Sequence, residues 1–177
     1  NLIVFNGGKI IFNDDIDKVS ENIQIFKDVI LYHGKENLCY NEFSKPYINI
    51  VTAADNLENA TACVSYLVRE IESDAKGYIQ KNPNANQKEV SEYVFNHFLN
   101  GEKFDKVKYC HTYAEYVLFA ATLMTNCIKK YDFAKQLLLQ PGYGYNTILE
   151  GYKEVFDYAL DENLAQEAYK VLVKYSK

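Results

Sequence analysis

The chain contains no tryptophan and only one arginine, Arg69, among its 177 residues. Its 19 lysine and arginine residues are outnumbered by 24 aspartate and glutamate residues, which gives a formal net charge of −5. A protein that binds nucleic acid gathers basic side chains on one face, because they must neutralise phosphates. The sequence shows no such gathering, so we expect no nucleic-acid partner.

Long apolar runs and cofactor motifs are also missing. A membrane-spanning helix needs about 20 consecutive apolar residues, and no run in this chain approaches that length. The cysteines form no CxxC pair and no Cys/His cluster with zinc-binding spacing. The Gly142-Tyr143-Gly144-Tyr145 segment lacks the Lys-Ser/Thr ending of a phosphate-binding loop. The sequence therefore predicts no membrane span, no metal and no cofactor.

Catalytic groups are equally scarce. The three histidines are His33, His97 and His111. His111 follows Cys110, but neighbours in sequence rarely reach the geometry of a nucleophile and its base. The carboxylates at 70–74 are typical of a solvated helix face. We therefore expect a protein that is not an enzyme.

What the sequence does contain is helical periodicity. Hydrophobic residues make up 48% of the chain, which is enough for a core. Apolar residues recur at three- and four-residue spacing, which predicts helices at 14–32, 45–80, 87–100, 111–140, 145–159 and 162–175. Asn6-Gly7-Gly8 between two apolar tetrads predicts a hairpin or arm within 1–12. The expected fold is a single all-α domain over 1–177, a helical bundle with two helices at its carboxy-terminal end, 145–176.

The chain also carries an internal repeat. Val19-Ser20-Glu21 precedes Cys39 by twenty residues, and Val90-Ser91-Glu92 precedes Cys110 by the same interval. Each cysteine leads into a long helical run with a second cysteine. This pattern predicts two helix–long-helix units, at about 14–81 and about 87–140, joined by the linker 82–86.

Four cysteines in a repeated pattern favour two disulfides and an oxidising compartment. If 111–140 is one helix, Cys110 and Cys127 lie about 25 Å apart at 1.5 Å per residue. A disulfide requires Cα atoms within about 7 Å of each other. We therefore expect bridges Cys39–Cys127 and Cys63–Cys110 across two antiparallel long helices. The alternative is one bridge inside each unit, which requires both long helices to be broken.

Two further sites follow from local motifs. Asn59-Ala60-Thr61 is an acceptor for N-glycosylation if the chain enters the secretory pathway. Tyr143 and Tyr145 sit in a predicted helix–helix turn and are candidate contacts for a partner, because tyrosine combines an apolar ring with a polar tip.

These features resemble the bicycle proteins, secreted effectors of aphids and related gall-forming insects. That family is named for two cysteine–tyrosine–cysteine motifs. The matching segments here are Cys39-Tyr40 through Cys63 and Tyr109-Cys110 through Cys127, and the high tyrosine, asparagine and lysine content is similar too. The resemblance implies a salivary protein that is delivered into host plant tissue, and it implies no catalytic residues.

Two functions follow as hypotheses. The first is a secreted insect effector that binds a host macromolecule, a protein by preference, without catalysis; such a protein needs an exposed apolar or tyrosine-rich patch of a few hundred Å². The alternative is a secreted helical carrier of a small hydrophobic ligand, which needs a dry cavity of about 300–1,000 Å³. The sequence leaves the oligomeric state open.

Overall fold

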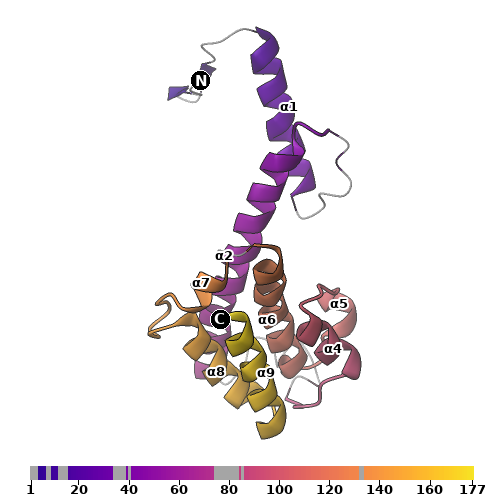
Figure 1. Cartoon of the computed structure of the whole chain (residues 1–177), viewed down its shortest axis with the longest axis vertical. Helices are drawn as coiled ribbons and strands as arrows, with labels where there is room; N and C mark the ends of the chain where they lie inside the picture. The colour runs from indigo at the N-terminus through magenta and orange to yellow at the C-terminus, as the bar shows by residue number, and fades with distance from the viewer. Residues whose placement is uncertain are drawn as a thin grey trace. The chain divides into compact units, whose positions relative to one another are not determined.

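The computed structural model describes residues 4–6, 9–11, 16–33, 39, 41–73, 84, 86–131 and 134–177, without the side chains of 4–6, 9–11, 16–19 and 59–60. It confirms a mostly helical fold (Figure 1). The elements in chain order are β1 (Val4–Asn6), β2 (Lys9–Ile11), α1 (Ile16–Tyr32), α2 (Lys45–Glu72), α4 (Glu92–Asn100), α5 (Lys106–Tyr109), α6 (Tyr113–Lys130), α7 (Lys135–Leu138), α8 (Ile148–Ala159) and α9 (Glu162–Tyr175).

The two strands form the predicted hairpin. They pair antiparallel, with Val4 opposite Ile11 and Asn6 opposite Lys9. The paired residues flank the Gly7-Gly8 dipeptide, and this is the register that a two-residue connection between strands produces.

The chain divides into two compact units, and the boundary falls inside α2. The first unit covers residues 1–55 and the second covers residues 56–177. The linker predicted at 82–86 concerns the two repeat copies; residues 82, 83 and 85 lie outside the described part of the chain, and the linker stays a prediction.

In the first unit, a buried carboxylate connects α1 to the turn before α2. Asp28 is only 5% exposed and accepts hydrogen bonds from Ser44 Oγ at 2.6 Å, Asn41 Nδ2 at 2.9 Å and Gln24 Nε2 at 2.7 Å. A buried carboxylate is costly unless donors satisfy its oxygens, and here three donors do so. Ile48 is fully buried in the same unit. This network fixes the start of α2 against α1.

In the second unit, α6 is the central helix. It packs against α4, α8 and α9, and Figure 1 shows it between the α4–α5 pair and the α8–α9 pair. Nearly every residue from Tyr113 to Cys127 on α6 is buried, which is why its sequence is apolar all round. The core holds the fully buried aromatic side chains Phe98, Tyr152 and Phe156.

Local signals set the helix ends in the second unit. Ser91 caps α4 by accepting a hydrogen bond from the backbone N–H of Val94. Gly101 ends α4 in the left-handed conformation at φ 59°, which glycine adopts without strain. Thr147 and Glu150 form a reciprocal capping box at the start of α8, and Asp161 caps α9.

Some predicted boundaries need correction. The helix predicted over 87–100 begins only at Glu92, because Ser91 holds the cap. The helix predicted over 111–140 is wrong as a continuous element: α6 ends at Lys130, and Tyr131 is extended at φ −139°. The chain then forms the short helix α7, which packs on α8 and buries Leu138. Packing of α7 on its neighbours thus overrides the continuous helical period. Helix α2 ends at Glu72, within the predicted range, and 74–80 lies outside the described residues.

The internal repeat stays a prediction. Helices α1 and α4, which the repeat pairs, are 17 and 9 residues long. Helices α2 and α6 are 28 and 18 residues long. Any common ancestry would therefore have to include loss of helical turns from the second copy.

Candidate functional site

The first unit exposes large apolar side chains along both of its helices. Ile23, Phe26 and Ile30 recur at helical spacing on α1, and Tyr47, Ile50 and Val51 do so on α2. We call these six residues the docking face. Ile30 and Ile50 are 69% and 67% exposed, and Phe26 and Tyr47 are 53% and 52% exposed. In a folded protein, apolar side chains exposed together on one face mark a surface that another molecule covers.

The docking face borders a groove between α1 and α2. The groove encloses about 390 Å³ and is open to solvent on one side. The residues that line it are Asn22, Ile25, Phe26, Val29, Tyr47, Ile50 and Val51. Every lining residue in this described part of the first unit is uncharged, so the groove suits an apolar occupant.

The Asp28 network positions this groove. The hydrogen bond from Ser44 is the largest cause that lowers the pKa of Asp28, and the bonds from Gln24 and Asn41 act the same way while burial opposes them. Asp28 is therefore ionised at neutral pH, as a triple acceptor should be. Asn41 and Ser44 lie just before α2, so their hydrogen bonds to the ionised carboxylate of Asp28 on α1 fix the two helices that form the walls of the groove.

The exposed apolar area of the docking face is as large as the patches that partners cover on other proteins. A fully exposed aromatic side chain has about 150–250 Å² of surface. A fully exposed aliphatic side chain has about 100 Å² of apolar surface, which is its transfer free energy divided by about 25 cal/mol/Å². With the observed exposed fractions, the docking face amounts to roughly 400 Å². Leu31 and Phe43, which are also exposed on this unit, raise the total to roughly 600 Å².

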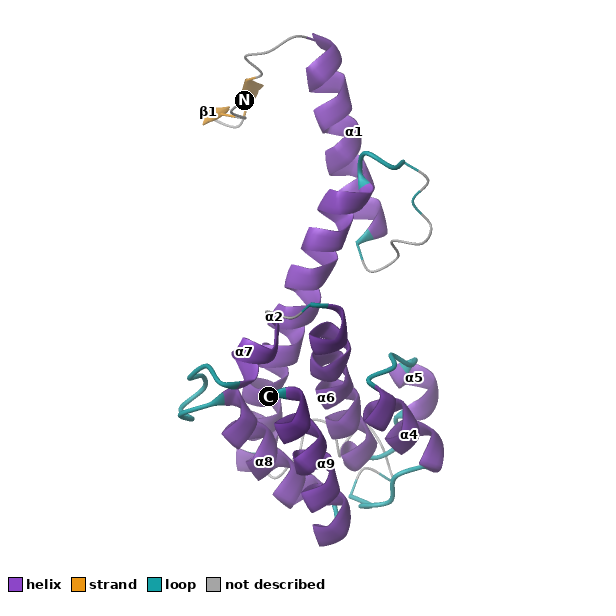
Figure 2. Ribbon diagram, in the orientation of Figure 1, coloured by secondary structure: helices purple, strands orange, loops and turns teal. Residues whose placement is uncertain are grey.

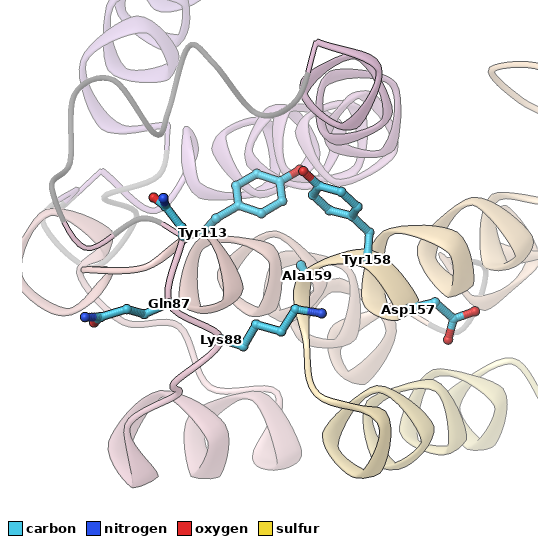
Figure 3. Close-up of a pocket in the computed structure, with 7 residues that line it drawn as sticks. Gln87, Lys88, Tyr113, Asp157, Tyr158 and Ala159 are labelled. Carbon is cyan, nitrogen blue, oxygen red and sulfur yellow. The ribbon is translucent and has the colours of Figure 1, made fainter.

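A second cavity lies in the second unit, and its polar groups already serve the fold. It encloses about 400 Å³, and Figure 3 shows Tyr113 and Tyr158 extending toward each other while Asp157 points away. Tyr113 donates a hydrogen bond to the carbonyl oxygen of Leu67 at 3.0 Å, and Lys88 Nζ donates to the carbonyl oxygen of Leu160 at 3.2 Å. This cavity is a weaker candidate for that reason.

The cysteines require the largest correction. All four lie within the described residues, and the structure forms no disulfide among them, so the predicted bridges Cys39–Cys127 and Cys63–Cys110 are not supported. Each cysteine packs as a small apolar residue instead: Cys127 is buried in the core on α6, and Cys63 packs against that core from α2. The even count misled because it cannot separate paired cysteines from buried ones. Without supported bridges, the cysteine count no longer indicates an oxidising compartment.

Burial makes these thiols poor nucleophiles. It raises the pKa of Cys63 to about 11 and the pKa of Cys110 to about 12, although Lys106 lowers both pKa values in part. Burial also raises the pKa of Cys127. Cys110 Sγ donates to the carbonyl oxygen of Glu115 at 3.6 Å. The thiol next to His111 is therefore protonated at neutral pH.

We expect alkylation to report this protection. At pH 8 a thiol with a pKa near 11 carries roughly 100-fold less thiolate than an ordinary cysteine. Compared with the denatured chain, the native chain should therefore react with a maleimide or an aromatic disulfide reagent about 100-fold more slowly at Cys63 and about 1,000-fold more slowly at Cys110. Denatured chain that has never been reduced is the control, and it should titrate all four thiols. A lower titre there would show that bridges form in solution.

The remaining predicted sites fall at different places in the fold. Asn59 lies within α2, where the hydroxyl of Thr61 bonds to the carbonyl oxygen of Leu57 at 2.9 Å; the side chain of Asn59 is outside the described part. Glycosylation there stays a prediction. Tyr143 is exposed and adopts the left-handed conformation at φ 55°. It belongs to the loop between α7 and α8, which Figure 2 draws in teal. Tyr145 is partly buried and donates to Glu154 at 2.8 Å. Partner contact at Tyr143 and Tyr145 stays a prediction.

The described residues contain no group of three or more His, Cys, Asp and Glu side chains that could hold a metal ion. No helix among them is both long and apolar enough to cross a membrane.

Sequence reasoning missed the docking face. Periodicity predicted a helix at 14–32 but did not indicate that Ile23, Phe26 and Ile30 on it are exposed. A signal was present in the sequence. Apolar residues occupy so many positions between Ile23 and Tyr32 that they surround most of the helix, and one packing partner cannot cover them all.

Comparison of the chain with models of known protein families, with characterised proteins and with solved structures gives no match.

Proposed function

We propose that this chain is a non-enzymatic binding protein, and that the docking face takes up a protein partner. One observation carries the proposal: six large apolar side chains on α1 and α2 border an uncharged groove and remain exposed to water. The second unit, by contrast, packs most of its large apolar side chains into a single core around α6. The first unit supplies the contact surface, and the second supplies a stable body.

The area of the docking face fits such a role. Covering roughly 400 Å² of apolar surface contributes about 10 kcal/mol at about 25 cal/mol/Å². Association costs about 4–15 kcal/mol in lost translational and rotational freedom. The difference is small, so the partner must add contacts of its own, and the fit of its side chains into the groove decides the affinity.

The family resemblance supplies the biological setting for this proposal. In that setting the chain is a secreted insect effector delivered into plant tissue, and the partner is a host protein. An apolar docking face agrees with recognition of a folded host protein or of an amphipathic helix, which lays its apolar side into a groove of this kind.

A photo-cross-linker in the full-length chain tests the proposal. Tyr47 is replaced by benzoylphenylalanine, and the chain is incubated with protein extract from host plant tissue. We expect a saturable adduct at position 47 that disappears when Ile50→Asp is added, because a carboxylate in the groove repels an apolar occupant. Mass spectrometry identifies the protein joined at position 47.

The matched control places the same cross-linker at Tyr158. That tyrosine is 39% exposed but belongs to the second unit. The proposal is wrong if positions 47 and 158 give the same adducts, or if Ile50→Asp leaves the adduct at position 47 unchanged. Circular dichroism of each variant establishes that the helices are retained.

The carrier function is the second candidate. The groove volume of about 390 Å³ lies within the usual range of about 300–1,000 Å³ for small-ligand sites. However, such sites enclose most of the ligand surface, about 70–90% of it, whereas this groove is open on one side. The openness favours a macromolecular partner, which can cover the exposed side chains beside the groove as well as the groove itself.

A further inference from the structure

The docking face is also suited to pair with the same face of a second copy of the chain. We infer that its first partner is a second copy of this chain, and that two copies pair through α1 and α2 in the isolated protein. This inference rests on the proposed function and names one partner of the same face. The paired state keeps the apolar side chains out of water until another protein displaces one copy.

Charge is the first argument. Two copies that meet through one face bring like charges together across the symmetry axis, which opposes pairing. Here the groove lining within the described first unit carries no charge, so no like charges meet inside the groove when two copies pair. A face designed for an acidic or a basic partner would instead carry charges of the opposite sign.

Shape is the second argument. Phe26, Tyr47, Ile50 and Val51 of the docking face line the groove, whereas Ile23 and Ile30 are exposed on α1 outside the lining. Helices pack by placing the ridges of one into the grooves of the other. In a two-fold pair, Ile23 and Ile30 of each copy pack into the groove of the other copy. The four helices then form one bundle with a shared apolar core.

Area is the third argument. A standard interface buries about 800 Å² per partner, of which about 56–58% is apolar. That apolar share is roughly 450 Å². The docking face offers roughly 400 Å² of apolar surface, which is close to that share. One face per copy is therefore sufficient for a reversible dimer, without any contribution from the second unit.

Sedimentation equilibrium of the purified full chain tests this inference. We expect a reversible monomer–dimer equilibrium between about 1 µM and about 100 µM, the range of weak to moderate dimers. Phe26→Asp and Ile50→Asp should each weaken the dimer at least about tenfold, since each buries a carboxylate in the shared core. Hydrogen exchange of residues 22–30 and 47–51 should slow as the concentration rises.

Val107→Asp is the matched control, because Val107 is 85% exposed on α5 in the second unit. It should dimerise like the wild type. A wild type that stays monomeric at about 100 µM overturns the second-copy inference alone, since an adduct with a host protein at position 47 would still support the proposed function. Ile50→Asp that dimerises like Val107→Asp overturns it as well.

Discussion

Replacing Phe98 by alanine is expected to lower the free energy of unfolding by about 3–5 kcal/mol, the usual cost of removing a buried phenylalanine. Phe98 is fully buried on α4. Its ring meets Phe156 of α8 edge to face at 6.2 Å between centroids, and it meets Phe95 at the same distance. The alanine variant loses these contacts and leaves a cavity between two helices, and both losses add to the cost. Urea unfolding followed by circular dichroism measures the change.

Phe43→Ala is the control for this prediction. Phe43 is 72% exposed in the first unit, so its removal should change the free energy of unfolding by less than about 0.5 kcal/mol. If Phe98→Ala cost less than about 1 kcal/mol, the Phe98 ring would not be packed in the core as described.

The second large effect is expected at Glu115, on α6. Its side chain is only 3% exposed, and its two carboxylate oxygens accept hydrogen bonds from backbone N–H groups: Ser91 at 2.9 Å and His111 at 2.8 Å. One carboxylate thus joins the start of α4 to the segment before α6. Glu115→Ala leaves both N–H groups without this acceptor, at about 1–3 kcal/mol each. We expect a loss of about 3 kcal/mol or more in the free energy of unfolding at pH 7.

The pH dependence of the same residue adds an independent readout. Burial raises the pKa of Glu115, but the hydrogen bonds from His111 and Ser91 together outweigh it and hold the pKa below its ordinary value of 4.5. Since the folded pKa is the lower one, the stabilisation is complete above pH 4.5 and is lost as the pH falls through the folded pKa.

Glu115→Gln is the near-isosteric variant that separates this effect from packing. The difference in stability between wild type and Glu115→Gln should be largest near neutral pH and should shrink in acid, because the wild-type carboxylate becomes neutral there. Asp28, whose pKa is also lowered, is present in both proteins and cancels in the comparison. A difference that stays constant with pH would show that the carboxylate charge does not contribute.

Sequence patterns predicted the helices whose ends carry local signals. The last helix was expected at 162–175, and α9 occupies Glu162–Tyr175, because Asp161 supplies a cap that the sequence shows directly. The hairpin was predicted for a similar reason, from two glycines between apolar tetrads. The break after Lys130 was not predictable in this way. No glycine or proline marks it, and packing of α7 against α8 decides it.

The candidate site was harder to predict than the fold. Periodicity shows that a helix has an apolar side, but it does not show whether that side has a partner within the chain. Ile50 lies within the helix predicted at 45–80, and its exposure follows from how α1 and α2 are placed in three dimensions. The same limit applies to Cys63 and Cys127. Each was predicted to form a bridge with another cysteine, while the surroundings of both make them packing residues.

The uncharged lining of the groove has a consequence for the speed of recognition. Oppositely charged surfaces attract each other over long distances and accelerate encounter, and added salt removes that advantage. A groove without charge gains nothing from such steering. Its association rate should stay near the ordinary value of about 10⁵–10⁶ M⁻¹s⁻¹ at low and high ionic strength alike. How long each complex lasts then determines how much of the chain is occupied.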